Sequence, residues 1–343
     1  MTLVYLHTVL DSPNEHQKKV LQDLADNSDG LLVTTESAVE ILESVTYRIS
    51  RSKIKHIDHG IRMQNPSLWD RLALKQEYGL ESQLLVTTLG LHSPGKGLQY
   101  SIRAYARFLD ESCTQVQRRK LIYLIAGTCH PEFVKTQGGS LYQEFQAELD
   151  QAVEDSRLRC LKVKELGTDD FGQCDLVFLE AFLNESALLK LYAATNVMVL
   201  PYLNMEQISS GILADTVGSG RVVIATKFKY ALELIDSQAQ GKKGVIIGPR
   251  ARGILVDPGE PSVEQIAQGL DYLVFNKDER LEMEKRTHER GYQMRWHNSA
   301  WELLQYVQFI TEKREIVSGR GVEFIREKAS IFQKKNARLL MRP

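Results

Sequence analysis

The feature that most limits the fold of this chain is a regular alternation of short apolar runs with longer segments that carry apolar residues at helical spacing. A short, continuous apolar run suits a strand buried on both faces of a sheet. The amphipathic segments between the runs supply the crossover helices that parallel strands require. The alternation therefore predicts an α/β fold with parallel sheets, with strands at Leu84–Leu89, Leu121–Ala126, Val197–Leu200, Val222–Thr226 and Gly253–Val256.

These β–α units form two series, which we interpret as two domains. Residues 1–61 offer strands at Leu3–His7, Leu31–Thr35 and Ile54–Ile57, about half of a doubly wound domain. Residues 62–82 are polar and irregular, as expected of a linker. Residues 83–295 contain enough units for a complete Rossmann-like domain. Residues 296–343 are predicted to form a helix that returns to the N-terminal domain, followed by a basic tail.

Composition argues against several classes of protein. The formal net charge is -1 with both signs mixed along the chain, so no basic surface is expected for nucleic acid. No apolar run is long enough to cross a bilayer and the N-terminus lacks a secretion signal. We therefore expect a cytoplasmic protein, for which peripheral membrane contact stays open. The four cysteines show no metal-ligand or disulfide spacing, so no metal site is predicted.

The strongest candidate site lies between Pro201 and Thr226. The strand predicted before Pro201 is followed by a polar loop and a helix, and the unpaired N–H groups at a helix start attract an anion. In an open parallel sheet, nucleotides bind at such strand ends. An ordinary capped helix behind a solvated loop would give the same pattern. The candidate residues are Glu206, Gln207 and Asp215, as acceptors for sugar and ribose hydroxyls, and Ser209, Ser210 and Gly211 at the helix start.

A second candidate site is the segment Leu89-Gly-Leu-His-Ser-Pro-Gly-Lys-Gly-Leu98. It also joins a predicted strand to a helix, and the ammonium of Lys96 could meet a diphosphate beside that helix start. It is not a P-loop, because Lys96 is followed by Gly97 rather than by Ser or Thr. A solvated Gly-Lys-Gly turn is the alternative interpretation.

Taken together, these motifs resemble the C-terminal half of retaining glycosyltransferases with the two-Rossmann-domain GT-B fold, the family-four-like group. The resemblance runs from about Leu84 to Trp296, and each motif alone is weak. Tyr5-Leu-His-Thr8, Thr34-Thr-Glu-Ser37 and His56-Ile-Asp-His-Gly60 resemble the later part of the N-terminal domain in that family. The other matching stretches are Gly90 with Pro94-Gly-Lys-Gly-Leu98, Ile125-Ala-Gly-Thr-Cys-His-Pro131, Leu188-Leu-Lys-Leu-Tyr-Ala-Ala-Thr-Asn196 before Val199-Leu-Pro201, and Gly220-Arg-Val-Val-Ile-Ala-Thr226.

The resemblance implies a role for each matching residue. His7 would touch the transferred sugar near the reaction centre, and Lys96 would contact the donor diphosphate. The family's two glutamates fall on Gln207, for the donor sugar, and Asp215, for the ribose. Glu206 could substitute for the first glutamate. The amides and hydroxyls of Ser209, Ser210 and Gly211, together with the Gly90 loop, would complete the donor site.

The implied reaction moves a hexose from a UDP- or GDP-sugar to a hydroxyl of a glycan, lipid or small molecule, with retention of anomeric configuration. No metal or other cofactor is obligatory in this interpretation. Neither the donor nor the acceptor can be identified from the sequence, and the oligomeric state is not predicted.

This chain also departs from the family pattern. Leu91 stands where the family commonly has an arginine, Gln207 replaces a glutamate, and Val222 replaces a proline. The family's opening strand and glycine-rich loop have no counterpart, so we expect an N-terminally truncated first domain. Two alternatives therefore stay open: a catalytically silent subunit that binds a nucleotide sugar, and an epimerase or phosphorylase on the same fold.

Overall fold

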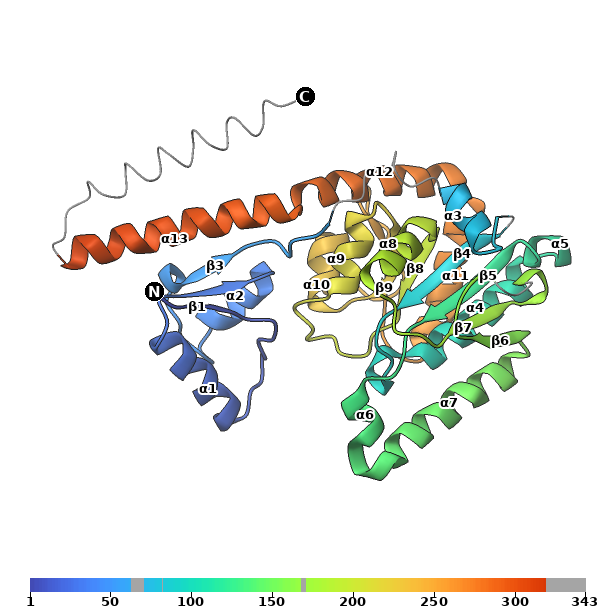
Figure 1. Ribbon diagram of the computed structural model, residues 1–343, viewed down its shortest axis with the longest axis horizontal. Coiled ribbons are helices and arrows are strands. Elements are labelled where there is room, and N and C mark those ends of the chain that lie inside the picture. Colours follow the sequence, from blue (N-terminus) through green and yellow to red (C-terminus); the bar gives the residue numbers. More distant parts are fainter. Residues whose placement is uncertain (63–70, 82, 168–170, 319–343) are drawn as a thin grey trace. The chain divides into compact units, whose positions relative to one another are not determined.

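The computed structural model describes residues 1–62, 71–81, 83–167 and 171–318, and its elements are labelled in Figure 1. The chain divides into two compact units. Unit 1 comprises Met1–Asp58 with the segment from His297 onward, and unit 2 comprises His59–Trp296. The predicted basic tail and residues 63–70 of the predicted linker lie outside the described residues.

Unit 2 is built on a seven-stranded sheet in the order β10-β9-β8-β4-β5-β7-β6, and every pair in it is parallel. This confirms the predicted α/β class. The strands are β4 (Leu84–Leu89), β5 (Leu121–Ala126), β6 (Cys160–Val163), β7 (Leu176–Leu179), β8 (Val197–Leu200), β9 (Val222–Thr226) and β10 (Gly253–Val256).

Two hydrophobic cores cover the two faces of this sheet, because successive side chains of a strand point to opposite sides. On β4, Val86 belongs to one core, whereas Leu85 and Leu89 belong to the other. The first core is formed with α4 (Leu98–Ser112), α7 (Ser140–Ser156) and α11 (Pro261–Phe275). The second is formed with α8 (Glu185–Ala194), α9 (Gly211–Gly218) and α10 (Lys229–Ile235). Unit 2 is therefore a three-layer sandwich, as Figure 1 shows.

The order of the strands contains a topological switch point. From β4 the chain proceeds to β5 on one side, whereas β8, the other neighbour of β4, leads to β9 in the opposite direction. The loops after β4 and β8 therefore leave the carboxyl edge of the sheet at the switch point. In open α/β sheets this is where ligands bind. Both candidate motifs lie in these two loops.

Unit 1 contains a three-stranded parallel sheet of β1 (Leu3–Tyr5), β2 (Gly30–Val33) and β3 (Ile54–His56), in that order. Its connecting helices are α1 (Glu15–Asp26) and α2 (Glu36–Glu43). Helix α13 (Trp296–Ser318) supplies Tyr306 and Ile310 to a small core with Leu32 and Ile57. The Tyr306 hydroxyl donates a hydrogen bond to the Lys53 carbonyl at 3.1 Å. The returning C-terminal helix is thus part of this unit.

The structure adds elements that the sequence pattern did not predict. Helix α3 (Arg71–Glu77) lies within the segment expected to be irregular, and its buried face includes Leu74. Strands β6 and β7 were also missed. The pattern of β6 includes exposed Lys162, whereas β7 is buried and apolar throughout and is as long as the predicted strand β8. The other described α-helices are α5 (Gln115–Arg118), α6 (Pro131–Lys135) and α12 (Lys277–Gln293). Among the described helices, none combines the length and the apolar character needed to cross a bilayer.

Candidate functional site

The loops that follow β4 and β8 are in direct backbone contact on both sides of Lys96. The backbone N–H of Leu203 donates a hydrogen bond to the Gly95 carbonyl at 2.9 Å. Gly97 has a φ of +63°, and a Cβ at this position would lie 2.2 Å from the Pro201 carbonyl oxygen. Only glycine permits both this left-handed conformation and this approach. The close packing fixes Lys96 over the second loop.

The other end of the first loop lies against helix α9. Gly90 has a φ of +121°, and a Cβ added there would lie 3.5 Å from the side chain of Ile212, in the first turn of α9. The first loop therefore spans from the start of α9 to Pro201. We call the group formed by Gly90, Lys96 and the Ser209–Gly211 start of α9 the Lys96 site.

The Lys96 ammonium rests on an aromatic ring. Its Nζ lies 3.8 Å from the centroid of the Tyr202 ring, within the distance at which a cation is attracted by the π face. Across the described part of the chain, no carboxylate forms an ion pair with Lys96. Burial lowers the pKa of Lys96 below its usual value, because desolvation disfavours the charged form. The site thus holds a cation that can accept an anionic partner.

Helix α9 begins as the sequence predicted, with a side-chain cap that belongs to the Lys96 site. Ser210 is the N-cap residue, and its hydroxyl accepts a hydrogen bond from the Leu213 N–H at 3.2 Å. The cap satisfies only one of the four N–H groups that a helix start leaves without intrahelical partners. The amide of Gln207 donates to the Ser209 carbonyl at 2.7 Å, which ties the loop to the helix start.

Glu206 has a partner that sequence reasoning missed. Its carboxylate lies 2.8 Å from the Nζ of Lys229, the first residue of α10. The backbone N–H of Lys229 also donates to the Met205 carbonyl at 2.9 Å. This exposed ion pair fixes where Glu206 points. Its predicted contact with the donor sugar stays a prediction.

Asp215 lies on α9 as a partly buried carboxyl group. Burial raises its pKa to about 6, the nearby Glu185 carboxylate adds to the shift, and Arg62 opposes it. Arg62 is itself ion-paired with Glu185. No hydrogen bond or ion pair involves the Asp215 side chain within the described ranges. Such a carboxylate has acceptor capacity available for hydroxyl groups of a ligand.

His7 and His59, both within stretches quoted from the sequence, lie in different units. His7 follows β1 in unit 1; its imidazole is exposed and contacts the Tyr5 ring edge-on, with centroids 4.7 Å apart. His59 belongs to unit 2, where a Cβ built on Gly211 would lie 4.0 Å from its Nε2. The His59 Nδ1 donates to the Gly60 carbonyl at 3.0 Å. His59 therefore lies at the start of α9, and the role of His7 stays a prediction.

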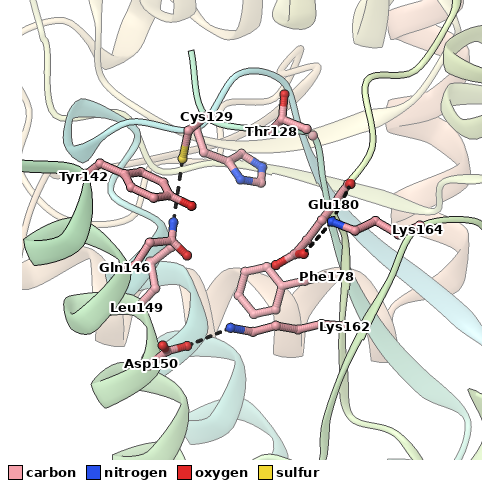
Figure 2. Close-up of a pocket in the computed structure, with 12 residues that line it drawn as sticks. Thr128, Cys129, Tyr142, Gln146, Leu149, Asp150, Lys162, Lys164, Phe178 and Glu180 are labelled. Carbon is pink, nitrogen blue, oxygen red and sulfur yellow. Dashed lines mark hydrogen bonds and ion pairs between the residues drawn. The ribbon is translucent and has the colours of Figure 1, made fainter. Parts of the chain in front are cut away.

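A pocket of about 160 Å³ lies at the carboxyl ends of β5, β6 and β7. Figure 2 shows residues that line it. Its charged groups are paired: Lys162 with Asp150 at 2.8 Å, and Lys164 with Glu180 at 3.0 Å. His92, from the same loop as Lys96, lines the pocket with a buried Nε2 that has no hydrogen-bond partner among the described residues. Burial lowers the pKa of His92 to about 4, so it is neutral at pH 7.

Sequence reasoning found the two loops but missed three contributors to their geometry: Tyr202, Lys229 and His92. Tyr202 directly follows Pro201 in the sequence, so an aromatic residue at a strand end was the available signal. No comparable signal marks Lys229, since its contact with Glu206 depends on the packing of α10. Among the described residues, no cluster of three or more His, Cys, Asp or Glu side chains could hold a metal ion.

Several solved structures share this architecture. The HepE protein of Anabaena in complex with UDP matches with a TM-score of 0.65 and 15% identity, over 90% of this chain and 72% of that chain. Sucrose-phosphate synthase from Thermosynechococcus elongatus matches with a TM-score of 0.65 and 16% identity, over 91% and 68%. An α,α-trehalose-phosphate synthase (UDP-forming) from Burkholderia xenovorans, in complex with glucose-6-phosphate, matches with a TM-score of 0.61 and 14% identity. The match covers 90% of this chain and 68% of that chain.

These likenesses show that the chain has the GT-B fold, as the sequence motifs implied. The two parallel sheets agree with that assignment. No protein-family model matches the chain, and no curated protein sequence matches it.

Proposed function

We propose that this protein transfers a hexose from a nucleoside diphosphate sugar to a hydroxyl acceptor, with retention of anomeric configuration. The observation that supports the proposal is that the loop carrying Lys96 packs through Gly90 against Ile212 in the first turn of α9, at the switch point of the sheet. A diphosphate is the anion that best fits a lysine and a helix start placed side by side. HepE was solved with UDP and with UDP-glucose, which favours a UDP-sugar as the donor.

In the proposed reaction, the bond between the anomeric carbon and the diphosphate oxygen breaks, and a bond to the acceptor oxygen forms on the same face. The charge that develops on the leaving diphosphate is stabilised by Lys96 and the N–H groups of α9. The acceptor proton passes to a phosphate oxygen, so no protein base is assigned. Asp215 would hold the ribose, and Gln207 or Glu206 the sugar hydroxyls.

The pocket of Figure 2 is the proposed place of the nucleoside. It shares the loop after β4 with the Lys96 site, because His92 lines the pocket and Lys96 follows four residues later. The Lys96 charge also helps to lower the pKa of His92, which puts the two groups within electrostatic reach. A neutral imidazole with an unpartnered nitrogen suits an uncharged base or ribose better than a phosphate.

Calorimetry against UDP-glucose, GDP-mannose and UDP tests the proposal. UDP and one sugar nucleotide should bind the parent, and Lys96→Ala should bind them roughly tenfold to a hundredfold more weakly, through loss of a charge-assisted contact. Lys285→Ala is the matched control, since Lys285 pairs with Glu282 on the surface. If Lys96→Ala binds UDP as tightly as the parent, the assignment of Lys96 is wrong.

Transfer itself needs a separate measurement. Incubation with the donor that binds and a panel of glycan, lipid and sugar acceptors should give a product whose anomeric proton coupling in NMR matches that of the donor. A product with the opposite coupling would overturn retention. Binding without transfer or donor hydrolysis would favour a catalytically silent subunit, whereas release of sugar phosphate or an epimerised donor would favour a phosphorylase or an epimerase.

A further inference from the structure

Tyr202 occupies a place in the Lys96 site that its hydrophobicity alone does not explain. The residue follows β8 and Pro201, and only 1% of it is exposed. Its ring stacks on Phe228 at the end of β9, with centroids 5.3 Å apart and planes 27° apart. Because Phe228 is also fully buried, this stacking restricts the movement of the Tyr202 ring. The Lys96 ammonium lies over the same ring, 3.8 Å from its centroid.

The Tyr202 ring stabilises the buried charge of the Lys96 ammonium without neutralising it. Burial disfavours its charge, and a carboxylate partner would stabilise that charge but also neutralise it. The π face of Tyr202 attracts the cation at 3.8 Å without carrying a net negative charge. A lysine held in this way keeps its full charge for an incoming anion.

We propose that Tyr202 is a positioning residue, whose ring face holds the Lys96 ammonium in place for the diphosphate of the donor. This inference rests on the proposed function for its ligand, but the pairing of ring and ammonium can be tested without any ligand. The contact between Gly97 and Pro201 sets the register, since it fixes the backbone of Lys96 directly over the residue before Tyr202.

The first test compares three variants with UDP and with uridine as probes. Tyr202→Leu removes the ring face, and UDP should bind about 10- to 30-fold more weakly, as expected for the loss of a desolvated cation–π contact. Uridine carries no phosphate, so its affinity should change less than threefold. Tyr202→Phe keeps the ring face and should retain most of the UDP affinity. In a Lys96→Met background, Tyr202→Leu should cause no further loss.

Two results would overturn the proposal: an equal loss for UDP and uridine, or the same loss in the Lys96→Met background. Either result would mean that Tyr202 stabilises the fold around the site and does not position the Lys96 ammonium. If Tyr202→Leu fails to fold, phenylalanines with increasing numbers of ring fluorines at position 202 replace it. Fluorination withdraws electron density from the ring face but keeps the ring, so UDP affinity should fall stepwise, and a constant affinity would contradict the proposal.

The second test requires no ligand. The pKa of Lys96, followed by NMR of its labelled side chain, should fall by about one unit in Tyr202→Leu and stay near the parent value in Tyr202→Phe. The face of the ring favours the charged form, so its removal lowers the pKa further. If the parent binds no nucleotide, the proposed function fails and this measurement alone decides the role of Tyr202. An unchanged pKa in Tyr202→Leu would then refute it.

Discussion

Asp215 is the residue at which binding and stability are expected to conflict. Its folded pKa of about 6 lies above the unfolded value of 3.8, so the folded state holds the proton more tightly between these pH values. The contribution of Asp215 to stability therefore falls as pH rises from about 4 to about 6. At pH 7.5 the charged, partly buried carboxylate costs up to about 3 kcal/mol, at about 1.4 kcal/mol per pKa unit.

Asp215→Asn should consequently raise the free energy of unfolding by about 1–3 kcal/mol at pH 7.5 and change it little at pH 4. Urea unfolding at the two pH values measures this. Asp257→Asn is a matched control of opposite sign, because contacts with Lys227, the Gly244 N–H and Gln265 lower the pKa of Asp257. An Asp215→Asn variant that is less stable at pH 7.5 would contradict the assignment of its pKa.

The same substitution tests the proposed ribose contact. An asparagine side chain can accept only through its single oxygen, whereas a carboxylate accepts through two. We expect Asp215→Asn to weaken UDP binding about tenfold in calorimetry at pH 7.5, although the variant is more stable. Binding of inorganic pyrophosphate, which has no ribose, should not weaken. If the two probes lose affinity equally, Asp215 does not contact the ribose.

At the scale of elements, the packing of the two loops of the Lys96 site depends on the close approach of Gly97 to the Pro201 carbonyl. Gly97→Ala should lower the free energy of unfolding by more than about 2 kcal/mol, because it combines a left-handed backbone with a Cβ 2.2 Å from the Pro201 carbonyl. Gly259→Ala is the matched control. Its φ is +70° and nothing lies within 4 Å of an added Cβ, so only about 1–2 kcal/mol of backbone strain is expected.

Thermal and urea unfolding of the two variants distinguish the cost of the left-handed backbone, which both variants share, from the cost of the steric clash with Pro201, which only Gly97→Ala has. Gly97→Ala should also weaken UDP binding, since the loop that carries Lys96 must move away from Pro201. Equal destabilisation in the two variants would show that the collision is relieved at no energetic cost and that the loops are not fastened at Gly97.

Most of the strands that the sequence predicted share one property, namely a run made mainly of apolar residues. Leu121–Ala126 is apolar throughout and lies in the middle of the sheet, and it was predicted with the observed bounds. Edge strand β6 places Lys162 and other half-exposed residues in its pattern, so its period is indistinct. The same limit applies to the site. The glycines and Lys96 belong to local motifs, whereas the contacts Lys96–Tyr202 and Glu206–Lys229 form only when separate strands become neighbours.

At the scale of the whole molecule, the two units differ in how they are stabilised. Unit 2 has an extensive core on each face of a seven-stranded sheet. Unit 1 has three short strands. One of its hydrophobic clusters has four buried residues, and two of them come from α13. Because local stability follows buried apolar contact, unit 1 should open at a lower free energy than unit 2. Helix α13 contributes half of the buried residues in one cluster of unit 1.

Tyr306→Ala tests this contribution. The ring is 7% exposed, packs over Gly30 of β2 and donates a hydrogen bond to the Lys53 carbonyl, so its loss should cost unit 1 about 3–5 kcal/mol. In hydrogen exchange followed by mass spectrometry, peptides covering β2 and β3 should lose protection, whereas those covering β4 and β5 should not. Trp301→Ala is the control, since Trp301 lies on the same helix but is 43% exposed. Equal loss of protection across both sheets would show that the two units unfold as one, and α13 would then stabilise the whole chain rather than unit 1.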